Sequence, residues 1–218
     1  MPVRNTPLVP GEFYHVYNRG NSRQIMYRTL HDYARFLALL YVANSTDSFV
    51  FRDIDSDVMF DHERGELLVA IGAYCLMPNH FHILLTPLVE DGAATFMRRL
   101  ATGYSMYFNK KHHRTGSLFE GRFKSEHVDS DNYLKYLFSY IHLNPVKLLQ
   151  PDWQQQGIIN LQDTFTYLYA YRYSSYIDNA VSRPESNILN RTPFPEYFAT
   201  KQAYDREMKD WLTYNDEL

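Results

Sequence analysis

His80 and His82 are separated by a single residue within a mostly apolar segment, residues 74–85. Successive side chains of a β-strand point to opposite faces, so the two imidazoles would share one face and Phe81 would take the other. Two neighbouring imidazoles on a sheet can chelate a divalent cation, with their spacing held by the backbone. An isolated pair of this kind is better explained by two half-buried histidines with hydrogen-bond partners, so a metal site requires further residues.

Further candidate residues follow about sixty positions downstream, where Tyr140 and Asn144 are four apart and would share one face of a helix. A phenol has a pKa near 10 and is a weak nucleophile unless it is assisted. A divalent cation could assist by polarising a phosphodiester and stabilising the leaving oxygen. An amide oxygen suits magnesium or manganese, and two imidazoles favour manganese or zinc. From the residues alone, Tyr136 could be the nucleophile as well as Tyr140, and either tyrosine could instead be a core residue of the helix. Asn144 could equally be a residue that ends the helix and satisfies its last carbonyls.

Hydrophobic spacing predicts the elements that must position these residues. Strands are predicted over 12–19, 48–54, 67–76 and 80–86, with a last strand ending at Val128. Helices are predicted over about 31–43 and 93–111, and from Ser130-Asp131 to the residue before Pro145. This order predicts an α+β fold, a ferredoxin-like antiparallel sheet with helices packed on one face. If the last helix covers the face of His80 and His82, then Tyr140 and Asn144 meet them.

The composition changes after Pro151, where the chain becomes polar and acidic. We therefore expect two parts, a catalytic domain over residues 1–150 and an extension over residues 151–218. The extension is predicted to be mostly helical or irregular, with a helical run near 199–213, and to pack on the core rather than form a second catalytic domain. Its role is not indicated by its sequence.

The distribution of charge points to a localised phosphate-binding surface. The net charge is −3, which argues against indiscriminate binding of nucleic acid by the whole surface. Residues 98–124, however, hold seven basic side chains and one acidic side chain, Glu120. Such a segment predicts a phosphate-binding face, and a solvated helix surface explains it about equally well. The seven candidates are Arg98, Arg99, Lys110, Lys111, Arg114, Arg122 and Lys124.

Several features bear on where the protein acts. No apolar stretch of the 218 residues reaches membrane-spanning length, and the N-terminus, which begins Met1-Pro2-Val3-Arg4, lacks the apolar core of a signal peptide. The single cysteine, Cys75, cannot form an internal disulfide and fits a buried apolar position. These features predict a cytoplasmic protein without a membrane partner.

Three segments, residues 80–82, 116–124 and 140–147, resemble the single-tyrosine HUH transposases, the family of small insertion-sequence transposases. Residues 17–21, Tyr-Asn-Arg-Gly-Asn, are similar to the subgroup of REP-associated tyrosine transposases. The likeness runs from about residue 10 to residue 150, with the motifs in the family's order and spacing. Each motif alone is weak evidence, whereas the ordered set is specific.

The resemblance implies a role for each candidate residue. His80 and His82 match the two histidine metal ligands, and Asn144 matches the polar third ligand. Insertion-sequence members often have Gln at this third position, whereas the REP-associated subgroup has Asn. Tyr140 matches the tyrosine that attacks single-stranded DNA, giving a 5′-phosphotyrosine link and a free 3′-hydroxyl. The implied cofactor is Mg²⁺ or Mn²⁺, and the implied partner is single-stranded DNA with hairpins, bound by the seven basic residues named above. Relatives include dimers and monomers, so a homodimer is one expectation.

The leading hypothesis is a DNA strand transferase and endonuclease, a metal-dependent transposase that cleaves and rejoins single-stranded DNA at hairpin-flanked sites. Two alternatives use the same fold. One is a hairpin-binding protein that does not cut, and the other is a metal-dependent phosphodiesterase that activates water and uses Tyr140 only structurally. The presence of all four candidate site residues favours the transposase, since a binding protein need not keep them.

Overall fold

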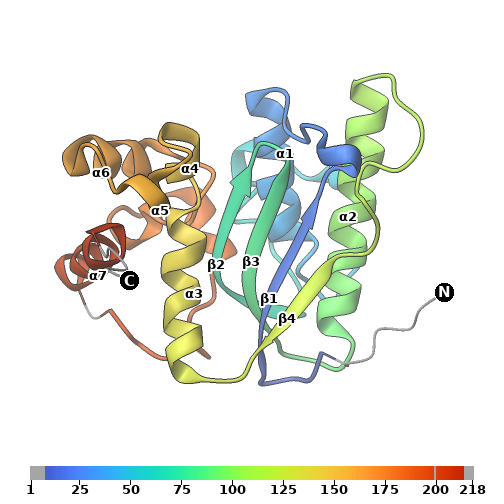
Figure 1. Cartoon of the computed structure of the whole chain (residues 1–218). Coiled ribbons are helices and arrows are strands. Elements are labelled where there is room, and N and C mark those ends of the chain that lie inside the picture. Colours follow the sequence, from blue (N-terminus) through green and yellow to red (C-terminus); the bar gives the residue numbers. More distant parts are fainter. Residues whose placement is uncertain (1–7, 199, 214–218) are drawn as a thin grey trace.

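A four-stranded antiparallel sheet forms the centre of the protein, in the order β2-β3-β1-β4 (Figure 1). The computed structural model describes residues 8–198 and 200–213. The strands are β1 (Phe13–Arg19), β2 (Val69–Met77), β3 (His80–Pro87) and β4 (Lys124–Val128). The two strands in the middle, β3 and β1, are therefore held by hydrogen bonds on both sides, which makes them the most constrained positions for functional side chains.

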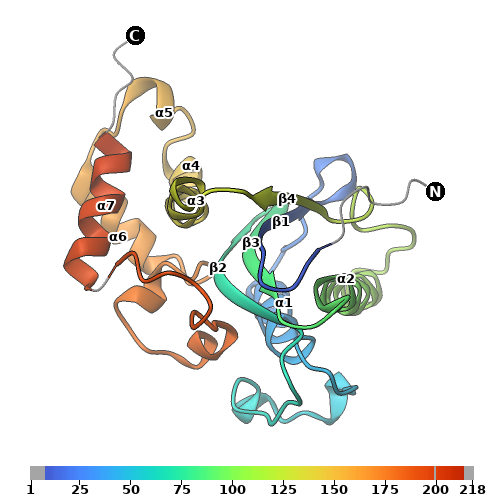
Figure 2. The ribbon, with the colours of Figure 1, turned by 90° about the horizontal axis from the view of Figure 1, so that it is seen from below.

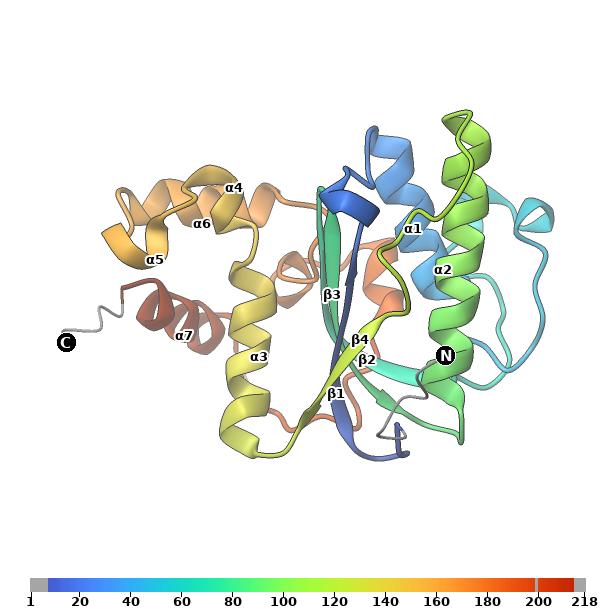
Figure 3. The ribbon, with the colours of Figure 1, turned by 45° about the vertical axis from the view of Figure 1, so that its right-hand side comes forward.

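Helices cover both faces of this sheet (Figures 2 and 3). Helices α1 (Leu30–Val42) and α2 (Gly92–Lys111) pack on one face, and α3 (Asp131–Leu143) packs on the other. The predicted α+β class and antiparallel sheet are confirmed, but the expectation of helices on one face is corrected. All residues of β2 are buried. A strand that is apolar on both faces must be covered by other elements on both faces, so helices are needed on each side of the sheet.

Most predicted elements are present, and one predicted strand is absent. Residues 48–54 form no strand; their apolar side chains Phe49, Phe51 and Ile54 pack on the core from a loop that includes a single 3-10 turn, η2 (Phe51–Asp53). The predicted start of α3 is confirmed, since the Ser130 hydroxyl accepts a hydrogen bond from the backbone N–H of Tyr133. Within the described residues, no helix combines the length and apolar character needed to cross a bilayer.

The residues after α3 form short helices beside it. These are α4 (Val146–Leu149), α5 (Trp153–Gln156), α6 (Leu161–Ala170) and α7 (Lys201–Thr213), with 3-10 turns η4 (Ile177–Asn179) and η5 (Pro184–Ile188). Helices α4, α5, α6 and α7 contribute to one apolar cluster with Leu143 of α3, whereas Ile188 of η5 is buried in the core beneath α1 and α2.

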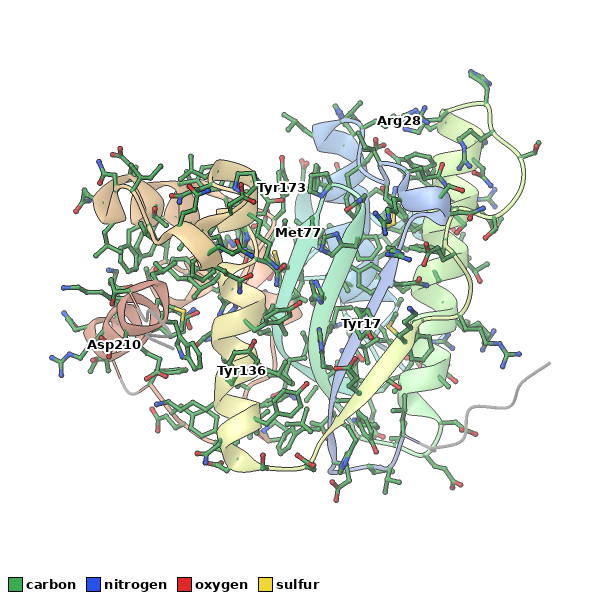
Figure 4. All side chains as sticks on the ribbon, in the orientation of Figure 1. Tyr17, Arg28, Met77, Tyr136, Tyr173 and Asp210 are labelled. Atoms are coloured by element: carbon green, nitrogen blue, oxygen red, sulfur yellow. The ribbon has the colours of Figure 1, made fainter. Side chains whose placement is uncertain are left out.

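A segment of this C-terminal part also covers the free edge of β2. The N–H of Leu76 donates to the carbonyl of Tyr173 at 2.9 Å, and the N–H of Ser175 donates to the carbonyl of Tyr74 at 3.0 Å. Figure 4 shows Tyr173 beside the end of β2 that carries Met77. The backbone groups of this edge are therefore paired within the chain rather than open to another molecule.

Candidate active site

A cavity of about 360 Å³ lies between α3 and the sheet, where β1 ends and β3 begins. Its lining includes His80 and His82 from β3, together with Tyr140 and Asn144 from the end of α3. The four residues singled out from the sequence are therefore neighbours in space. The helix and strand periods place the two residues of each pair on a shared face. The two pairs then meet because α3 lies on the face of the sheet that carries the histidines.

The register of the strands sets what surrounds the histidines. Tyr17 of β1 is opposite His82 on one side and opposite Lys124 of β4 on the other, while Arg19 is opposite His80. Directly paired residues of an antiparallel sheet project from the same face. The cavity floor therefore consists of two neighbouring cross-strand rows, one of Lys124, Tyr17 and His82 and the other of Arg19 and His80, and all of these residues are in its lining.

Each histidine of the pair uses one ring nitrogen within the protein. His82 Nδ1 is 2.8 Å from His15 Nε2, and His80 Nδ1 is 2.7 Å from Asn79 Oδ1. No hydrogen bond from the part of the chain that the structure describes reaches the Nε2 atom of either ring, both residues line the cavity, and the ring centroids are 5.0 Å apart. Metal-binding histidines have this arrangement, with one nitrogen for the cation and the other hydrogen-bonded.

The histidines are neutral at pH 7, as metal binding requires. Burial, with smaller contributions from Lys147 and Arg19, lowers the pKa of His80 to about 4. Burial also lowers the pKa of His82 well below its usual value, and His15 and His80 add to this. Burial lowers the pKa of His15 to about 4 as well, although the nearby Glu126 opposes the shift.

Asn144 completes a donor set that fits a divalent cation. Its amide N–H donates to the backbone carbonyl of Tyr140 at 2.8 Å, and no hydrogen bond from the described residues reaches its amide oxygen. Across residues 8–198 and 200–213, no group of three or more His, Cys, Asp or Glu side chains is arranged to hold a metal ion. A cation at this cavity would therefore be held by two imidazoles and one amide oxygen, which leaves positions for water or a phosphate.

Tyr140 is half-buried at the wall of the cavity. Its ring meets that of His82 edge-on, with centroids 5.5 Å apart, and Lys147 Nζ is 5.8 Å from its centroid. Burial raises the pKa of the Tyr140 hydroxyl, while a side-chain interaction with Asn144 acts in the opposite direction. The phenol is thus protonated at pH 7 and lies beside the candidate metal ligands.

Tyr136 is one helical turn away and occupies a different environment. Its ring contacts Trp211 of α7 at 5.0 Å between centroids, and it is not among the residues that line the cavity. Figure 4 shows Tyr136 on α3 and Tyr17 on β1 of the facing sheet. The structure therefore separates Tyr140 from Tyr136, which the sequence pattern alone could not do.

The basic segment 98–124 does not form one surface. Lys124 lines the cavity, but α2 lies on the opposite face of the sheet and carries Arg98, Arg99, Lys110 and Lys111 away from it. Arg99 donates to the carbonyls of residues 45 and 47, and Lys111 forms an ion pair with buried Asp32 at 2.7 Å. In the loops that follow α2, Arg114 donates to Asn109, and Arg122 is exposed.

Three other basic residues line the cavity, and the count of charges over 98–124 missed them. They are Arg19, Arg23 and Lys147. Arg19 forms an ion pair with Glu120 at 2.5 Å, which links the end of β1 to the loop before β4. Lys147 lies three residues after Asn144, and Arg19 is paired with His80. A search for basic residues within the motifs themselves would have found Arg19 and Lys147.

Comparison with known proteins agrees with this geometry. Residues 59–144 match the family model described as "Transposase IS200 like". No curated protein sequence matches the chain. The chain is similar to the solved "Structure of the REP associates tyrosine transposase bound to a REP hairpin", with a TM-score of 0.50 and 14% identity. The similarity covers 85% of this chain and 90% of that chain, and at this identity it shows a shared fold.

The matched segment contains β2, β3, α2, β4 and α3, and so it includes His80, His82, Tyr140 and Asn144. These findings support the resemblance to the single-tyrosine HUH transposases, because the segment of residues 59–144 matches the family model of IS200-like transposases.

Proposed function

We propose that this protein is a metal-dependent transposase that cleaves and rejoins single-stranded DNA beside hairpins, with Tyr140 as the nucleophile. His80, His82 and Asn144 would hold the divalent cation, Mg²⁺ or Mn²⁺. The observation that carries the proposal is one cavity in which a phenol meets two imidazoles and an amide oxygen. Among residues 8–198 and 200–213, no hydrogen bond reaches the Nε2 atoms of His80 and His82 or the amide oxygen of Asn144. The hairpin as partner is suggested by the similar solved protein, which is described as bound to a REP hairpin.

The proposed reaction exchanges one phosphodiester for another. The Tyr140 oxygen attacks the phosphorus, a bond between them forms, and the bond from phosphorus to the 3′ oxygen breaks. The phenol loses its proton and the departing 3′ oxygen gains one, which leaves a 5′-phosphotyrosine link and a free 3′-hydroxyl. Because a phosphodiester is conserved, a 3′-hydroxyl can reverse the step and rejoin DNA. A bound cation would polarise the phosphate and stabilise the leaving oxygen.

The chain's own residues would bind and orient the strand. Lys124 and Lys147 lie at the cavity and would hold the backbone phosphates near Tyr140. Tyr17 lines the same cavity and offers an aromatic face to an unpaired base. In this proposal residues 1–150 form the catalytic domain, and residues 151–218 form an extension packed on it. A homodimer stays a prediction, which light scattering of the purified protein would check.

The test is covalent capture of DNA by the protein. Labelled oligonucleotides that carry a hairpin and single-stranded flanks are incubated with Mn²⁺ or Mg²⁺ and separated on a denaturing gel. The wild-type protein is expected to give a slow-migrating adduct, and Tyr140→Phe is expected to give none. Tyr136→Phe is the matched control, because it removes the same hydroxyl one turn away and outside the cavity; it should retain the adduct.

Two outcomes would replace the proposal with one of its alternatives. Cleavage without an adduct, unchanged in Tyr140→Phe, would indicate hydrolysis by activated water. Hairpin binding without cleavage, across a panel of flanking sequences, would indicate a binding protein that does not cut.

A further inference from the structure

We propose that His15 is a positioning residue for His82, holding its imidazole in the tautomer that presents Nε2 to the cavity. The metal-binding consequence of this inference rests on the proposed function, whereas the tautomer itself does not. His15 belongs to β1, is 4% exposed, and is not among the residues that line the cavity. It acts on the site only through His82.

The sheet register puts the two rings side by side. Tyr17 is directly opposite His82, and His15 is opposite Leu84, so His15 is the diagonal neighbour of His82 on the same face. The rings are inclined by only 22°, and His15 Nε2 is 2.8 Å from His82 Nδ1. Both strands lie in the middle of the sheet, so the backbone fixes this contact.

The direction of the hydrogen bond follows from what lies on the far side of His15. Its Nδ1 atom is 3.9 Å from a carboxylate oxygen of Glu126, which favours a proton on Nδ1. A neutral imidazole with its proton on Nδ1 has an unprotonated Nε2 that accepts. His15 Nε2 therefore accepts, and His82 Nδ1 donates.

Glu126 is itself held in place by two tyrosine hydroxyls. Tyr17 donates to its Oε1 atom at 2.7 Å, and Tyr133 of α3 donates to its Oε2 atom at 3.3 Å. The result is a connected series of groups from Glu126 through His15 to His82. A proton placed on His82 Nδ1 leaves Nε2 with its lone pair, and Nε2 is the nitrogen that a cation in the cavity would need.

The tautomer can be measured directly, without metal or DNA. Long-range proton–nitrogen correlation spectra of ¹⁵N-histidine-labelled protein distinguish a protonated from an unprotonated ring nitrogen. In the wild-type protein His82 is expected to carry its proton on Nδ1, and in His15→Leu this preference is expected to be lost. A wild-type His82 protonated at Nε2, or an unchanged tautomer in His15→Leu, would overturn the inference.

Two conservative variants keep the test decisive if His15→Leu does not fold. Gln has an amide oxygen that reaches about as far as the Nε2 atom of His15, so His15→Gln should retain the wild-type tautomer. Asn is shorter, so His15→Asn should lose it, although both variants are polar. Equal spectra for His82 in the two variants would contradict a role for the hydrogen bond.

Mn²⁺ affinity, measured by titration calorimetry, gives a second readout that is independent of activity. His15→Leu and His15→Asn should bind about 10- to 100-fold more weakly than wild type, and His15→Gln should stay close to it. His127→Leu is the control, because His127 pairs with Glu12 and is opposite Tyr14, on the other face of the sheet. It should bind Mn²⁺ as the wild-type protein does.

The outcomes separate this inference from the proposed function. If His82→Ala abolishes Mn²⁺ binding and His15→Leu leaves it unchanged, the metal site stands and the role of His15 is wrong. If His80→Ala and His82→Ala both bind Mn²⁺ like the wild type, the proposed metal site is wrong, and the spectra alone decide the tautomer.

Discussion

The hydroxyl of Tyr204 on α7 hydrogen-bonds to Nδ1 of His142 on α3, and both side chains are buried. The other ring nitrogen of His142 is 2.7 Å from the hydroxyl oxygen of Ser175. Burial, with a smaller contribution from Arg191, lowers the pKa of His142 well below its usual value, so the ring is neutral. His142 lies between Tyr140 and Asn144 in the sequence. Tyr204 of α7 and Ser175 of the segment beside β2 therefore both support the helix that carries half of the candidate site.

Removal of this hydroxyl should destabilise the protein. In Tyr204→Phe a buried nitrogen of His142 loses its partner, which costs about 1–3 kcal/mol in the free energy of unfolding. Urea denaturation followed by circular dichroism measures the loss. The control is Tyr197→Phe, which removes a hydroxyl bonded to Asp131 at the surface and should cost less than about 1 kcal/mol. An equal decrease in the free energy of unfolding in the two variants would show that the buried hydrogen bond stabilises the protein no more than the surface one does.

Loss of either cavity histidine should separate cleavage from binding. We expect His80→Ala and His82→Ala to lose metal-dependent cleavage, because each removes one imidazole donor, while binding of the hairpin survives. Gel-based cleavage assays and fluorescence anisotropy measure the two properties. His31→Ala removes an exposed histidine at the start of α1 and should leave both unchanged. The metal assignment fails if His82→Ala cuts at the wild-type rate.

The placement of basic residues predicts which of them contact DNA. Lys124→Ala should weaken hairpin binding and reduce the slope of log affinity against log salt by about 1, because a phosphate contact releases about one counterion. Arg99→Ala should leave the slope unchanged, because Arg99 is bound to backbone carbonyls away from the cavity. Titrations at several salt concentrations measure both. Equal changes in slope would mean that DNA extends to the α2 face.

The lowered pKa of Asp32 predicts how the free energy of unfolding changes at acidic pH. Burial alone would raise its pKa, but hydrogen bonds from Lys111, Tyr107 and the backbone of Arg28 lower it to about 2. Since the folded pKa lies below the unfolded value of 3.8, the ionised carboxylate stabilises the fold above pH 3.8. This contribution is lost as the pH falls through about 2.

Asp32→Asn should therefore lower the free energy of unfolding at pH 7 by about 1–3 kcal/mol and flatten its decline between pH 4 and pH 2. Urea denaturation at a series of pH values provides the comparison. A variant whose stability falls as steeply with acid as that of the wild-type protein would show that another carboxylate is responsible.

The rate of adduct formation should rise with pH. Burial raises the pKa of Tyr140, so the nucleophilic phenolate is a small fraction at pH 7 and grows as the pH increases. His80, with a pKa of about 4, does not titrate in this range. Single-turnover rates between pH 6 and pH 9 are expected to increase by up to about tenfold per pH unit. A flat profile would indicate that loss of the phenol proton does not limit the rate.

The local parts of the site were predictable from the sequence, because they follow from the periods of a strand and a helix. The shared face of His80 and His82 needs only alternation, and that of Tyr140 and Asn144 needs only a four-residue spacing. The choice between Tyr140 and Tyr136 depends on where α3 crosses the sheet and on Trp211, which lies more than seventy residues away in sequence. That choice came from the resemblance to a family, and the structure adds that Tyr140 lines the cavity whereas Tyr136 does not.

Other features depend on contacts that no local pattern encodes. The contact between His15 and His82 depends on the register of β1 against β3, which joins residues 67 positions apart. The basic residues counted over 98–124 include those of α2, which packs on the face of the sheet opposite the cavity. A count of charges along the sequence does not indicate which face of a sheet a helix covers. The segment 48–54 has the composition of a strand, but its apolar side chains are buried from a loop.

The covered edge of β2 has a consequence for the growing chain. β2 is nine residues long, buried on both faces and without a charged side chain, so its bare edge would be a template for aggregation. Residues 173–175 provide the internal partner, and they are synthesised about a hundred residues after β2. A nascent or truncated chain that ends at residue 150 therefore exposes the unpaired backbone groups of an apolar edge strand, which can pair with another chain. We expect it to accumulate as insoluble protein rather than as a smaller enzyme.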